Sequence, residues 1–293
     1  MRVVDYIQQV AKRFDSARLH FGHGTDNSLD EAVYLVYCTL KISFSHHDNE
    51  KSVDRELTTT EKRVLDARVR RRIDERLPVA YIVGEAWFCG FAFHADPRAL
   101  IPRSPIAELI ENRFSGLFDW EPAHILDMCA GGGCIGIACA LTYPEARVDL
   151  VDISEASLEL ARLNCERHGV LGRVHTMHSD LYSGLDGRYD LIIANPPYVS
   201  QQKMQELPLE YRHEPRLGLE SEDKGLALPL AIIRGARKFL SNKGVLILEV
   251  GNNAEALQHR LKDIPLLWLE FEHGGHGVLA ITSGELEQFS NIF

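Results

Sequence analysis

The spacing of hydrophobic residues divides the chain into two parts with different periodicities. In the first part, apolar positions recur at helical spacing. Three helices are expected there: one over residues 3–20, one opened by the capping-box pattern Ser28–Glu31 and running to Leu40, and one opened by Thr58–Glu61 and running to Leu77, before Pro78. The polar stretch from Ser43 to Asp54 is expected to be a loop.

Beyond residue 84 the apolar residues come in short runs separated by turns. Aromatic residues alternate around Gly90 and predict a β-hairpin. The later runs predict strands at residues 125–127, 146–152, 174–178, 191–194 and 244–251, and a strand, turn and strand over 266–282. Strands that alternate with helical segments predict an α/β fold with a doubly wound sheet. The chain is thus expected to comprise a helical domain, residues 1–84, a hairpin connector, 85–104, and an α/β domain, 105–293.

Acidic residues, glycines or an asparagine follow four of the predicted strands. The first strand ends at Asp127 and leads into the glycine-rich turn Cys129–Gly133, while Asp152, Asp180 and Asn195 follow later strands. Glycines let the backbone approach a ligand, and the free N–H groups at a helix start can bind it. Because open α/β sheets bind ligands at the carboxyl ends of their strands, we expect these residues to line one site. Taken alone, Asp152 is equally suited to cap a helix, and Asp180 to be an ordinary loop acid.

The stretch Asn195-Pro196-Pro197-Tyr198 carries the most specific chemistry. Its prolines cannot donate to a sheet ladder, so they end the strand and hold Asn195 in an extended conformation. The Asn195 side-chain oxygen and the Pro196 carbonyl can together accept both hydrogens of a planar –NH₂ group, on whose face Tyr198 can stack. This suits alkylation of an amide or nucleobase nitrogen. The alternative is an Asx-Pro turn that closes a strand, and the four residues alone do not decide between the two.

Composition narrows the class of partner. Of 293 residues, 32 are Lys or Arg and 42 are Asp or Glu, giving a net charge of −10. A negative net charge is not typical of a protein that binds nucleic acid without a partner. It is consistent with a protein that binds a small cofactor or a basic protein. The six cysteines have no metal-binding spacing, so no metal is expected. The absence of a signal peptide or a long apolar run leads us to expect a cytoplasmic protein with no membrane contact.

The predicted third helix is rich in arginine, with Arg68, Arg70, Arg71, Arg72 and Arg76. A solvated helix face with ion pairs at i,i+4 spacing is the interpretation we favour. A contact with ribosomal RNA or another partner is the alternative.

The glycine turn, the strand-end acids and Asn-Pro-Pro-Tyr together resemble the protein-glutamine methyltransferases. The resemblance implies a class I S-adenosylmethionine-dependent methyltransferase fold, in which a Rossmann-like seven-stranded sheet with an antiparallel edge strand follows a small helical domain that recognises the substrate. It implies that the cofactor is bound by Asp127, Cys129, Ala130, Gly131, Gly132, Gly133, Asp152, Asp180, Leu181 and Asn195. Cys129 stands where the family usually has glycine, which leaves open whether the backbone there has a positive φ.

The resemblance also implies an activity: methyl transfer to the side-chain amide nitrogen of a glutamine. Asn195, Pro196 and Tyr198 take the catalytic positions, and Pro197 joins them in binding substrate. Glu214 is either a further substrate contact or a plain loop acid.

Six segments resemble the branch that acts on a large-subunit ribosomal protein: Gly22–Asn27, Ala86–Gly90, Ile101–Ile110, Asp127–Cys129, Tyr211–Pro215 and His273–Gly277. The release-factor branch usually has Arg-Pro-Glu-Thr in place of Arg103–Ile106, so a release factor is the alternative substrate. Adenine in DNA or RNA is less favoured because no basic groove or base-recognition domain is evident. A non-catalytic assembly factor is disfavoured because Asn195 and the glycine turn are intact.

Overall fold

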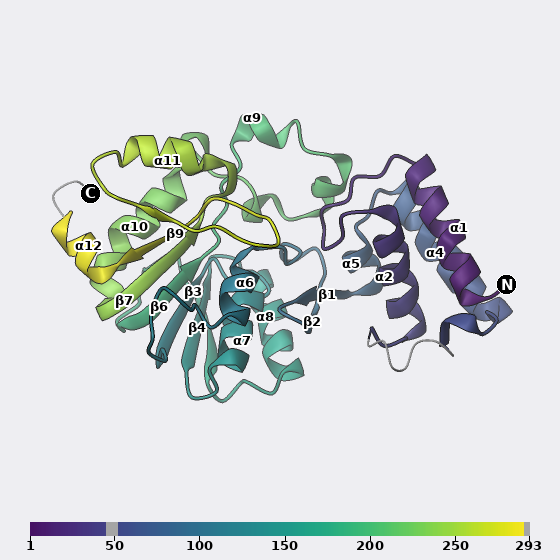
Figure 1. Cartoon of the computed structure of the whole chain (residues 1–293), viewed down its shortest axis with the longest axis horizontal. Coiled ribbons are helices and arrows are strands. Elements are labelled where there is room, and N and C mark those ends of the chain that lie inside the picture. Colours follow the sequence, from purple (N-terminus) through teal and green to yellow (C-terminus); the bar gives the residue numbers. More distant parts are fainter. Residues whose placement is uncertain (45–51, 290–293) are drawn as a thin grey trace.

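A computed structural model gives the fold and describes residues 1–44 and 52–289. Two lobes lie side by side (Figure 1). One is built from the helices of the first 83 residues, and the other is a sheet with helices on both faces. The hairpin of β1 (Glu85–Phe88) and β2 (Phe91–His94) lies between them, so the predicted hairpin is confirmed.

The helical lobe is held together by apolar faces of the predicted spacing. It contains α1 (Val3–Ser16), α2 (Ser28–Leu40), α4 (Thr59–Asp74) and α5 (Val79–Val83). Tyr6, Val10 and Phe14 of α1 are buried in one cluster with Leu35 of α2 and Leu65 of α4. This lobe therefore has an apolar core of its own.

The helix ends differ in detail from the sequence prediction. The predicted capping box of Thr58 and Glu61 is confirmed, but α1 ends at Ser16 and α4 at Asp74. At α2 the cap is Asn27, whose side chain accepts from the Asp30 N–H at 2.9 Å, and not Ser28. Of the predicted loop at 43–54, residues 45–51 lie outside the described part, and residues 52–54 are helical. The prediction missed this helical segment because it is too short to show a hydrophobic periodicity.

The sheet of the second lobe has seven strands in the order β5-β4-β3-β6-β7-β9-β8. These are β3 (His124–Met128), β4 (Arg147–Asp152), β5 (Val174–His178), β6 (Tyr189–Ala194), β7 (Leu240–Glu249), β8 (Leu267–Trp268) and β9 (Val278–Thr282). The five strands from β5 to β7 run parallel, while β9 runs antiparallel to both β7 and β8. The predicted α/β sheet with its antiparallel pair at one edge is confirmed.

Helices cover both faces of this sheet. They are α6 (Ile106–Glu111), α7 (Cys134–Thr142), α8 (Glu155–Arg167), α10 (Ala227–Phe239), α11 (Ala254–Arg260) and α12 (Ser283–Gln288). The short helix α9 (Gln201–Met204) has no buried residue and lies on a loop that projects from the sheet (Figure 1). Short 3₁₀ turns occur at Leu209–His213, Arg216–Gly218, Asp223–Gly225 and Gly251–Asn253. Successive strand residues face opposite sides: Ile125 joins the core under α6, α7 and α8, and Leu126 joins the core under α10, α11 and α12. Both faces are buried, so the central strands are apolar without alternation.

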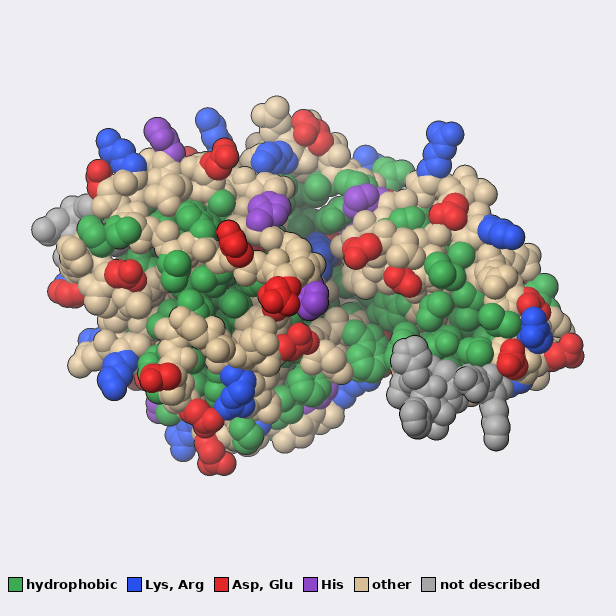
Figure 2. All heavy atoms as spheres, in the orientation of Figure 1, with side chains coloured by type: hydrophobic (Ala, Val, Ile, Leu, Met, Phe, Trp, Pro, Cys, Tyr) green, Lys and Arg blue, Asp and Glu red, His purple; other side chains and the backbone are tan. Residues whose placement is uncertain are grey.

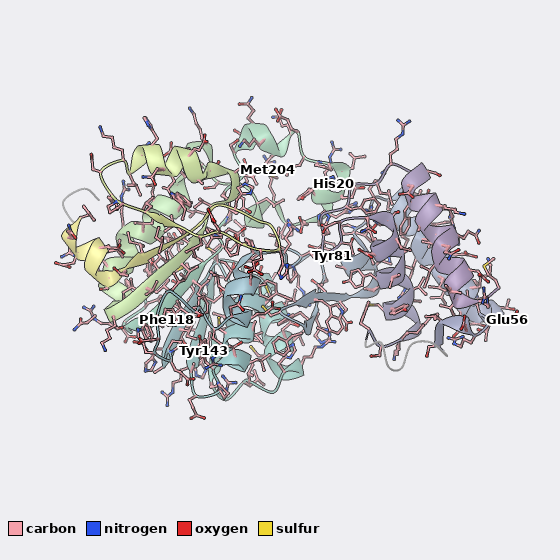
Figure 3. The ribbon with its side chains drawn as sticks, in the orientation of Figure 1. His20, Glu56, Tyr81, Phe118, Tyr143 and Met204 are labelled. Carbon is pink, nitrogen blue, oxygen red and sulfur yellow. The ribbon has the colours of Figure 1, made fainter. Side chains whose placement is uncertain are left out.

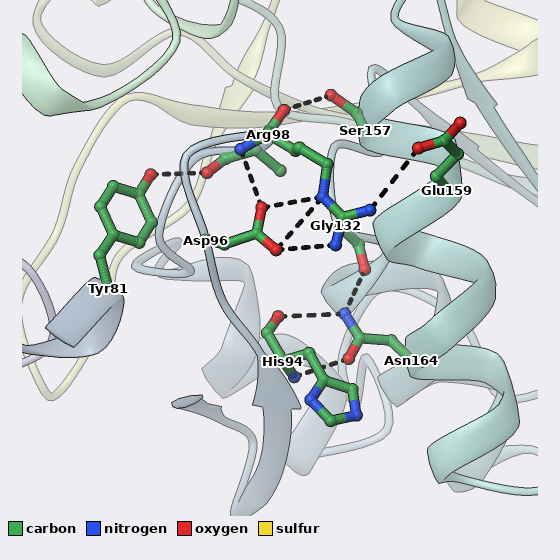
Figure 4. A network of polar contacts seen from close by, with 9 residues as sticks. Tyr81, His94, Asp96, Arg98, Gly132, Ser157, Glu159 and Asn164 are labelled. Carbon is green, nitrogen blue, oxygen red and sulfur yellow. Dashed lines mark hydrogen bonds and ion pairs between the residues drawn. The ribbon is translucent and has the colours of Figure 1, made fainter. Parts of the chain in front are cut away.

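The segment after the hairpin is anchored to both lobes (Figure 4). Tyr81 of α5 donates its hydroxyl to the Ala99 carbonyl at 2.7 Å, and Ser157 of α8 donates to the Arg98 carbonyl at 2.8 Å. Asn164 of α8 accepts from the His94 N–H at 2.7 Å and donates to the Gly132 carbonyl at 2.9 Å. The connector and the glycine turn are therefore fixed to the same helix.

A buried arginine joins the helical lobe to the lobe that contains the sheet. Arg72 of α4 is fully buried and donates to Glu31 at 2.9 Å, to Glu210 at 3.2 Å and to the His20 carbonyl at 2.8 Å. His20 marks this junction in Figure 3. The favoured prediction of a solvated arginine face is wrong for Arg72, because tertiary contacts enclose it, but the exposed pair of Arg71 and Glu75 at 3.4 Å has the predicted spacing.

Candidate active site

A cavity of about 220 Å³ opens at the carboxyl edge of the parallel strands. The strand ends and the loops that follow them contribute Cys129, Ala130, Gly131, Gly132, Asp152, Asp180, Leu181, Asn195 and Pro197 to its lining. The connector, residues 99–104, and the loop around residues 215–220 form the remaining walls. The structure thus brings most of the predicted site residues to one place.

The glycine turn runs with positive φ angles beside the cavity. Gly131 has φ 55°, and Cys129 has φ 61°, so cysteine keeps the left-handed backbone at the position where the resemblance implies glycine. At Gly132 an added Cβ would lie 3.5 Å from the nearest side-chain atom, whereas at Gly133 it would lie 2.9 Å from Leu150. Gly133 is therefore required for packing of α7, and it does not line the cavity.

Asp152, at the end of β4, ties the glycine turn to the next helix. One carboxylate oxygen accepts from the Gly131 N–H at 2.8 Å, and the other accepts from the Ser154 N–H at 2.8 Å. Burial raises the pKa of Asp152 above its usual value. The cap of α8 is Ser154, whose hydroxyl accepts from Ser157 N–H. Each Asp152 oxygen retains a second lone pair for a ligand hydroxyl.

Asp127 lies behind the glycine turn and not in the cavity. Its carboxylate is enclosed, and one oxygen accepts from the Gly136 N–H of α7 at 2.8 Å. Burial raises the pKa of Asp127 to about 7. Its other oxygen has no hydrogen-bond partner among residues 1–44 and 52–289. Asp127 is thus placed to position the turn and α7 through the backbone, without lining the cavity.

Asn195 follows β6 and lines the cavity together with Pro197, while Pro196 is buried. Within the described part of the chain, no side chain or backbone group is hydrogen-bonded to the Asn195 amide. An amide at a cavity wall without an internal partner is available to a ligand. This is the strongest chemical feature of the cavity.

Tyr198 is held from two directions. Its carbonyl accepts from the Asn253 side chain at 2.6 Å, and its hydroxyl donates to Glu249 at 3.0 Å. A Cβ at Gly251 would lie 2.7 Å from the Tyr198 ring, so glycine is needed for the ring to pack there. The ring does not line the cavity itself.

Glu249, at the end of β7, is a polar residue of the site that sequence reasoning missed. Its second carboxylate oxygen accepts from the Ser104 hydroxyl at 2.5 Å, and Ser104 lines the cavity. Burial raises the pKa of Glu249. The sequence does contain a signal for Glu249, because it is an acid at the carboxyl end of a predicted strand, like Asp127 and Asp152. In the structure that strand, β7, pairs with β6.

Glu214 does not reach the cavity, which corrects the prediction of a direct substrate contact. Its side chain is fully buried and accepts two hydrogen bonds from Arg103, both at 2.7 Å, and one from the Ile101 N–H at 3.0 Å. His23 Nε2 lies 3.3 Å from the carboxylate without hydrogen-bond geometry, so Arg103 is its principal partner. Glu214 instead joins the connector wall of the cavity to the loop in which Glu214 itself lies.

Comparison with known proteins agrees with this geometry. Residues 113–210 match the methyltransferase small domain family. A ribosomal protein uL3 glutamine methyltransferase from Francisella tularensis subsp. tularensis is 42% identical over 292 residues, which cover 99% of this chain and 92% of that protein. A protein of the same name from Xanthomonas campestris pv. campestris is 44% identical over 290 residues, which cover 97% of this chain and 92% of that protein.

The chain belongs to the ribosomal protein uL3 glutamine methyltransferase family. The predicted membership of the protein-glutamine methyltransferases, in the ribosomal-protein branch, is confirmed. The solved hMettl16 catalytic domain, in complex with an RNA hairpin, shares the fold at a TM-score of 0.52 and 15% identity, covering 84% of this chain and 91% of that one. At that identity the likeness shows the fold alone.

The cavity of this uL3 glutamine methyltransferase family member has the features that a nucleoside-bearing cofactor requires. Gly131 and Gly132 leave the turn open to close approach, since an added Cβ at Gly131 would meet only Ala99, at 3.8 Å. Asp152 offers acceptors for hydroxyl groups, and Leu181 adds an apolar surface. Across residues 1–44 and 52–289, no helix combines the length and apolar character needed to cross a membrane.

Proposed function

We propose that the protein transfers a methyl group from S-adenosylmethionine to the side-chain amide nitrogen of a glutamine in ribosomal protein uL3. Membership of the family named for that activity supports the assignment of uL3 as the substrate. The observation that carries the chemistry is the Asn195 amide, which lines the cavity with no internal hydrogen-bond partner among the described residues. A glutamine amide and an asparagine amide are complementary in donors and acceptors.

The cofactor would be held by the glycine turn and the strand-end acids. Gly131 and Gly132 would lie against it, Asp152 would accept from ribose hydroxyls, and Asp180 and Leu181 would flank the base. Cys129, Ala130 and Asn195 complete this proposed wall. Asp127 and Gly133 would act indirectly, by holding the turn in shape.

An amide nitrogen is a weak nucleophile because its lone pair is delocalised into the carbonyl. When bound, the cofactor supplies an electrophilic methyl group on a sulfonium. The amide nitrogen's electron pair forms the new N–C bond, the electron pair of the broken C–S bond stays on sulfur, and one amide proton is released. Asn195 Oδ1 and the Pro196 carbonyl would accept the amide hydrogens and so stabilise the positive charge that builds on nitrogen. Fixing the amide beside the methyl group is positioning chemistry. Tyr198, whose ring lies outside the cavity lining, would contribute by holding the loop that carries Asn195 and Pro196 through its hydrogen bonds to Glu249 and Asn253.

The charge of the chain fits a basic protein partner. A net charge of −10 favours approach of a Lys- and Arg-rich protein such as a ribosomal protein, and disfavours unaided binding of DNA. The proposed substrate implies a cytoplasmic site of action. A contact between α4 and ribosomal RNA remains a prediction, for which Arg70 and Arg71 are exposed.

A methyl-transfer assay with isotopically labelled S-adenosylmethionine tests the proposal. Purified uL3, a peptide release factor and duplex DNA serve as parallel substrates, and mass spectrometry locates any label. We expect label on a glutamine of uL3. Label on the release factor alone would overturn the uL3 assignment, and label on DNA alone would overturn amide methylation.

A further inference from the structure

A second pocket lies between the helical lobe and the connector, beside the candidate active site. Its lining comprises His23, Gly24, Thr25, Asp30, Val33, Tyr34, Phe44, Ala86, Trp87, Ile101 and Pro102. It has a volume of about 390 Å³. Figure 2 shows hydrophobic side chains gathered on this part of the surface, over α2 and β1, below a hollow between the lobes.

Two exposed aromatic side chains form one wall of this pocket. Trp87 is 42% exposed and Phe44 is 40% exposed, and their rings meet edge to face with centroids 5.3 Å apart. Ala86 and Phe88, the neighbours of Trp87 on β1, point into the protein and supply the packing of the strand. Trp87 therefore points away from the hairpin core, and exposed apolar groups of this kind mark interaction sites.

The pocket adjoins the candidate active site, and the two share one wall. Ile101 and Pro102 line both this pocket and the cavity that contains Asn195. A polypeptide that places one side chain beside Asn195 would therefore run along the connector, with a neighbouring segment at Trp87. Glu214 holds this shared wall in place through the Ile101 N–H and Arg103.

Polar groups at the pocket indicate what kind of segment fits. Asp30 is exposed and brings a negative charge to an otherwise apolar lining. The Thr25 hydroxyl oxygen is buried and, within residues 1–44 and 52–289, has no hydrogen-bond partner. An apolar side chain that is flanked by Lys or Arg matches this combination in shape and in charge.

We propose that this pocket binds a segment of the substrate protein flanking the methylated glutamine, taking an apolar side chain against Trp87 and a basic side chain at Asp30. The inference rests on the proposed function, because it assigns the pocket to the same substrate. Tryptophan is enriched among residues that dominate protein–protein binding energy, which makes Trp87 the decisive contact.

Steady-state kinetics of purified full-length variants test this with uL3 as the methyl acceptor. We expect Trp87→Ala to lower kcat/KM for uL3 by about tenfold, mainly through KM, and Trp87→Phe to restore most of the loss. Leu171→Ala, at an exposed leucine outside both cavities, is the matched control and should leave kcat/KM unchanged. The dissociation constant of S-adenosylmethionine should be unaltered in all three variants.

The charge at the rim is tested separately. The Asn27 side chain donates to Asp30 at 2.7 Å, and Asp30→Asn keeps an oxygen that can accept this bond while removing the charge. We expect Asp30→Asn to raise KM for uL3 about threefold at low salt, and by less at high salt, where the charge is screened. Asp15→Asn, at an exposed acid of α1 outside the pocket, is its control.

If Trp87→Ala keeps kcat/KM within twofold of wild type, or loses cofactor affinity in parallel with activity, the pocket is not a substrate site. If wild-type protein does not methylate uL3 at all, the proposed function fails instead. The two failures are therefore distinguishable.

Discussion

The Tyr198 hydroxyl donates to the Glu249 carboxylate at 3.0 Å, joining the ends of two neighbouring strands of the sheet. Tyr198 belongs to the loop after β6, and Glu249 ends β7. The same carboxylate accepts from Ser104 in the connector wall of the cavity. One buried acid therefore fixes the loop that carries Asn195 and Tyr198 relative to the connector wall of the cavity.

Removing this acid should slow methyl transfer without weakening cofactor binding. We expect Glu249→Gln to lower kcat about tenfold, because the neutral amide cannot accept from both Tyr198 and Ser104. Tyr198→Phe should have a similar effect, and the double variant should be no worse than either single variant. Glu255→Gln, at an exposed acid of α11, is the control. Fully additive losses would show that the two residues act independently.

Asn195 should be essential for transfer but not for cofactor binding. We expect Asn195→Ala to lower kcat by about 10³-fold, as for loss of a preorganised transition-state contact. The S-adenosylmethionine dissociation constant, measured by calorimetry, should change less than threefold. Asn112→Ala, at an exposed asparagine far from the cavity, controls for the chemistry of the substitution. Equal loss of cofactor affinity and of activity would contradict the role assigned to Asn195.

Asp152 should contribute mainly to cofactor affinity. Asp152→Ala removes an acceptor from the cavity wall and also the acceptor of the Gly131 N–H, so we expect the dissociation constant to rise about 10- to 100-fold. Calorimetric titration measures this directly, with the exposed Asp119→Ala as control. Unchanged affinity would mean that Asp152 only orders the turn.

Glu214 should stabilise the fold in a pH-dependent way. Burial alone would raise its pKa, but the contacts of His23 and Arg103 outweigh burial and hold the pKa of Glu214 at about 2, against an ordinary value of 4.5. A carboxyl group whose pKa is lower in the folded state than in the unfolded state stabilises the folded protein at any pH above its unfolded-state pKa. This stabilisation is lost as the pH falls through the folded-state pKa. At pH 7 the shift corresponds to roughly 3 kcal/mol.

Replacing Glu214 by Gln should therefore lower the free energy of unfolding at pH 7 by about 3 kcal/mol, since it leaves Arg103 without its anion. The difference from wild type should stay constant down to about pH 4.5 and shrink below it. Urea unfolding at pH 7, 5 and 3.5 measures this. A difference that does not shrink at pH 3.5 would show that the carboxylate charge is not responsible.

The parallel strands and their polar ends could be predicted because their signals are local. A run such as Leu191–Ala194, stopped by prolines, identifies a buried strand and places Asn195 at its end. Periodicity also distinguished the helical lobe from the sheet. Exact ends such as Ser16 were missed, because the last turn of a helix depends on contacts outside it.

Partnerships across long separations could not be predicted. Arg103 and Glu214 are bound to each other across 111 positions, and Arg72 and Glu210 across 138. From the charge pattern alone, such residues are expected to be exposed to solvent, because charged side chains are rarely buried unless they are paired. The local sequence does not show that these residues are buried or which partner each one has. Glu249 was missed for another reason: its strand was recognised, but its neighbour β6 and hence its approach to Tyr198 follow only from the strand order.

The most direct test of the central claim is site-localised mass spectrometry of uL3 isolated from cells. One strain carries the wild-type chromosomal copy of this protein, and the other carries Asn195→Ala. We expect a single methylated glutamine in uL3 from the first strain and an unmodified glutamine at that position in the second, with the variant protein present at wild-type levels. Unmodified uL3 in the wild-type strain, or full methylation in the Asn195→Ala strain, would contradict it.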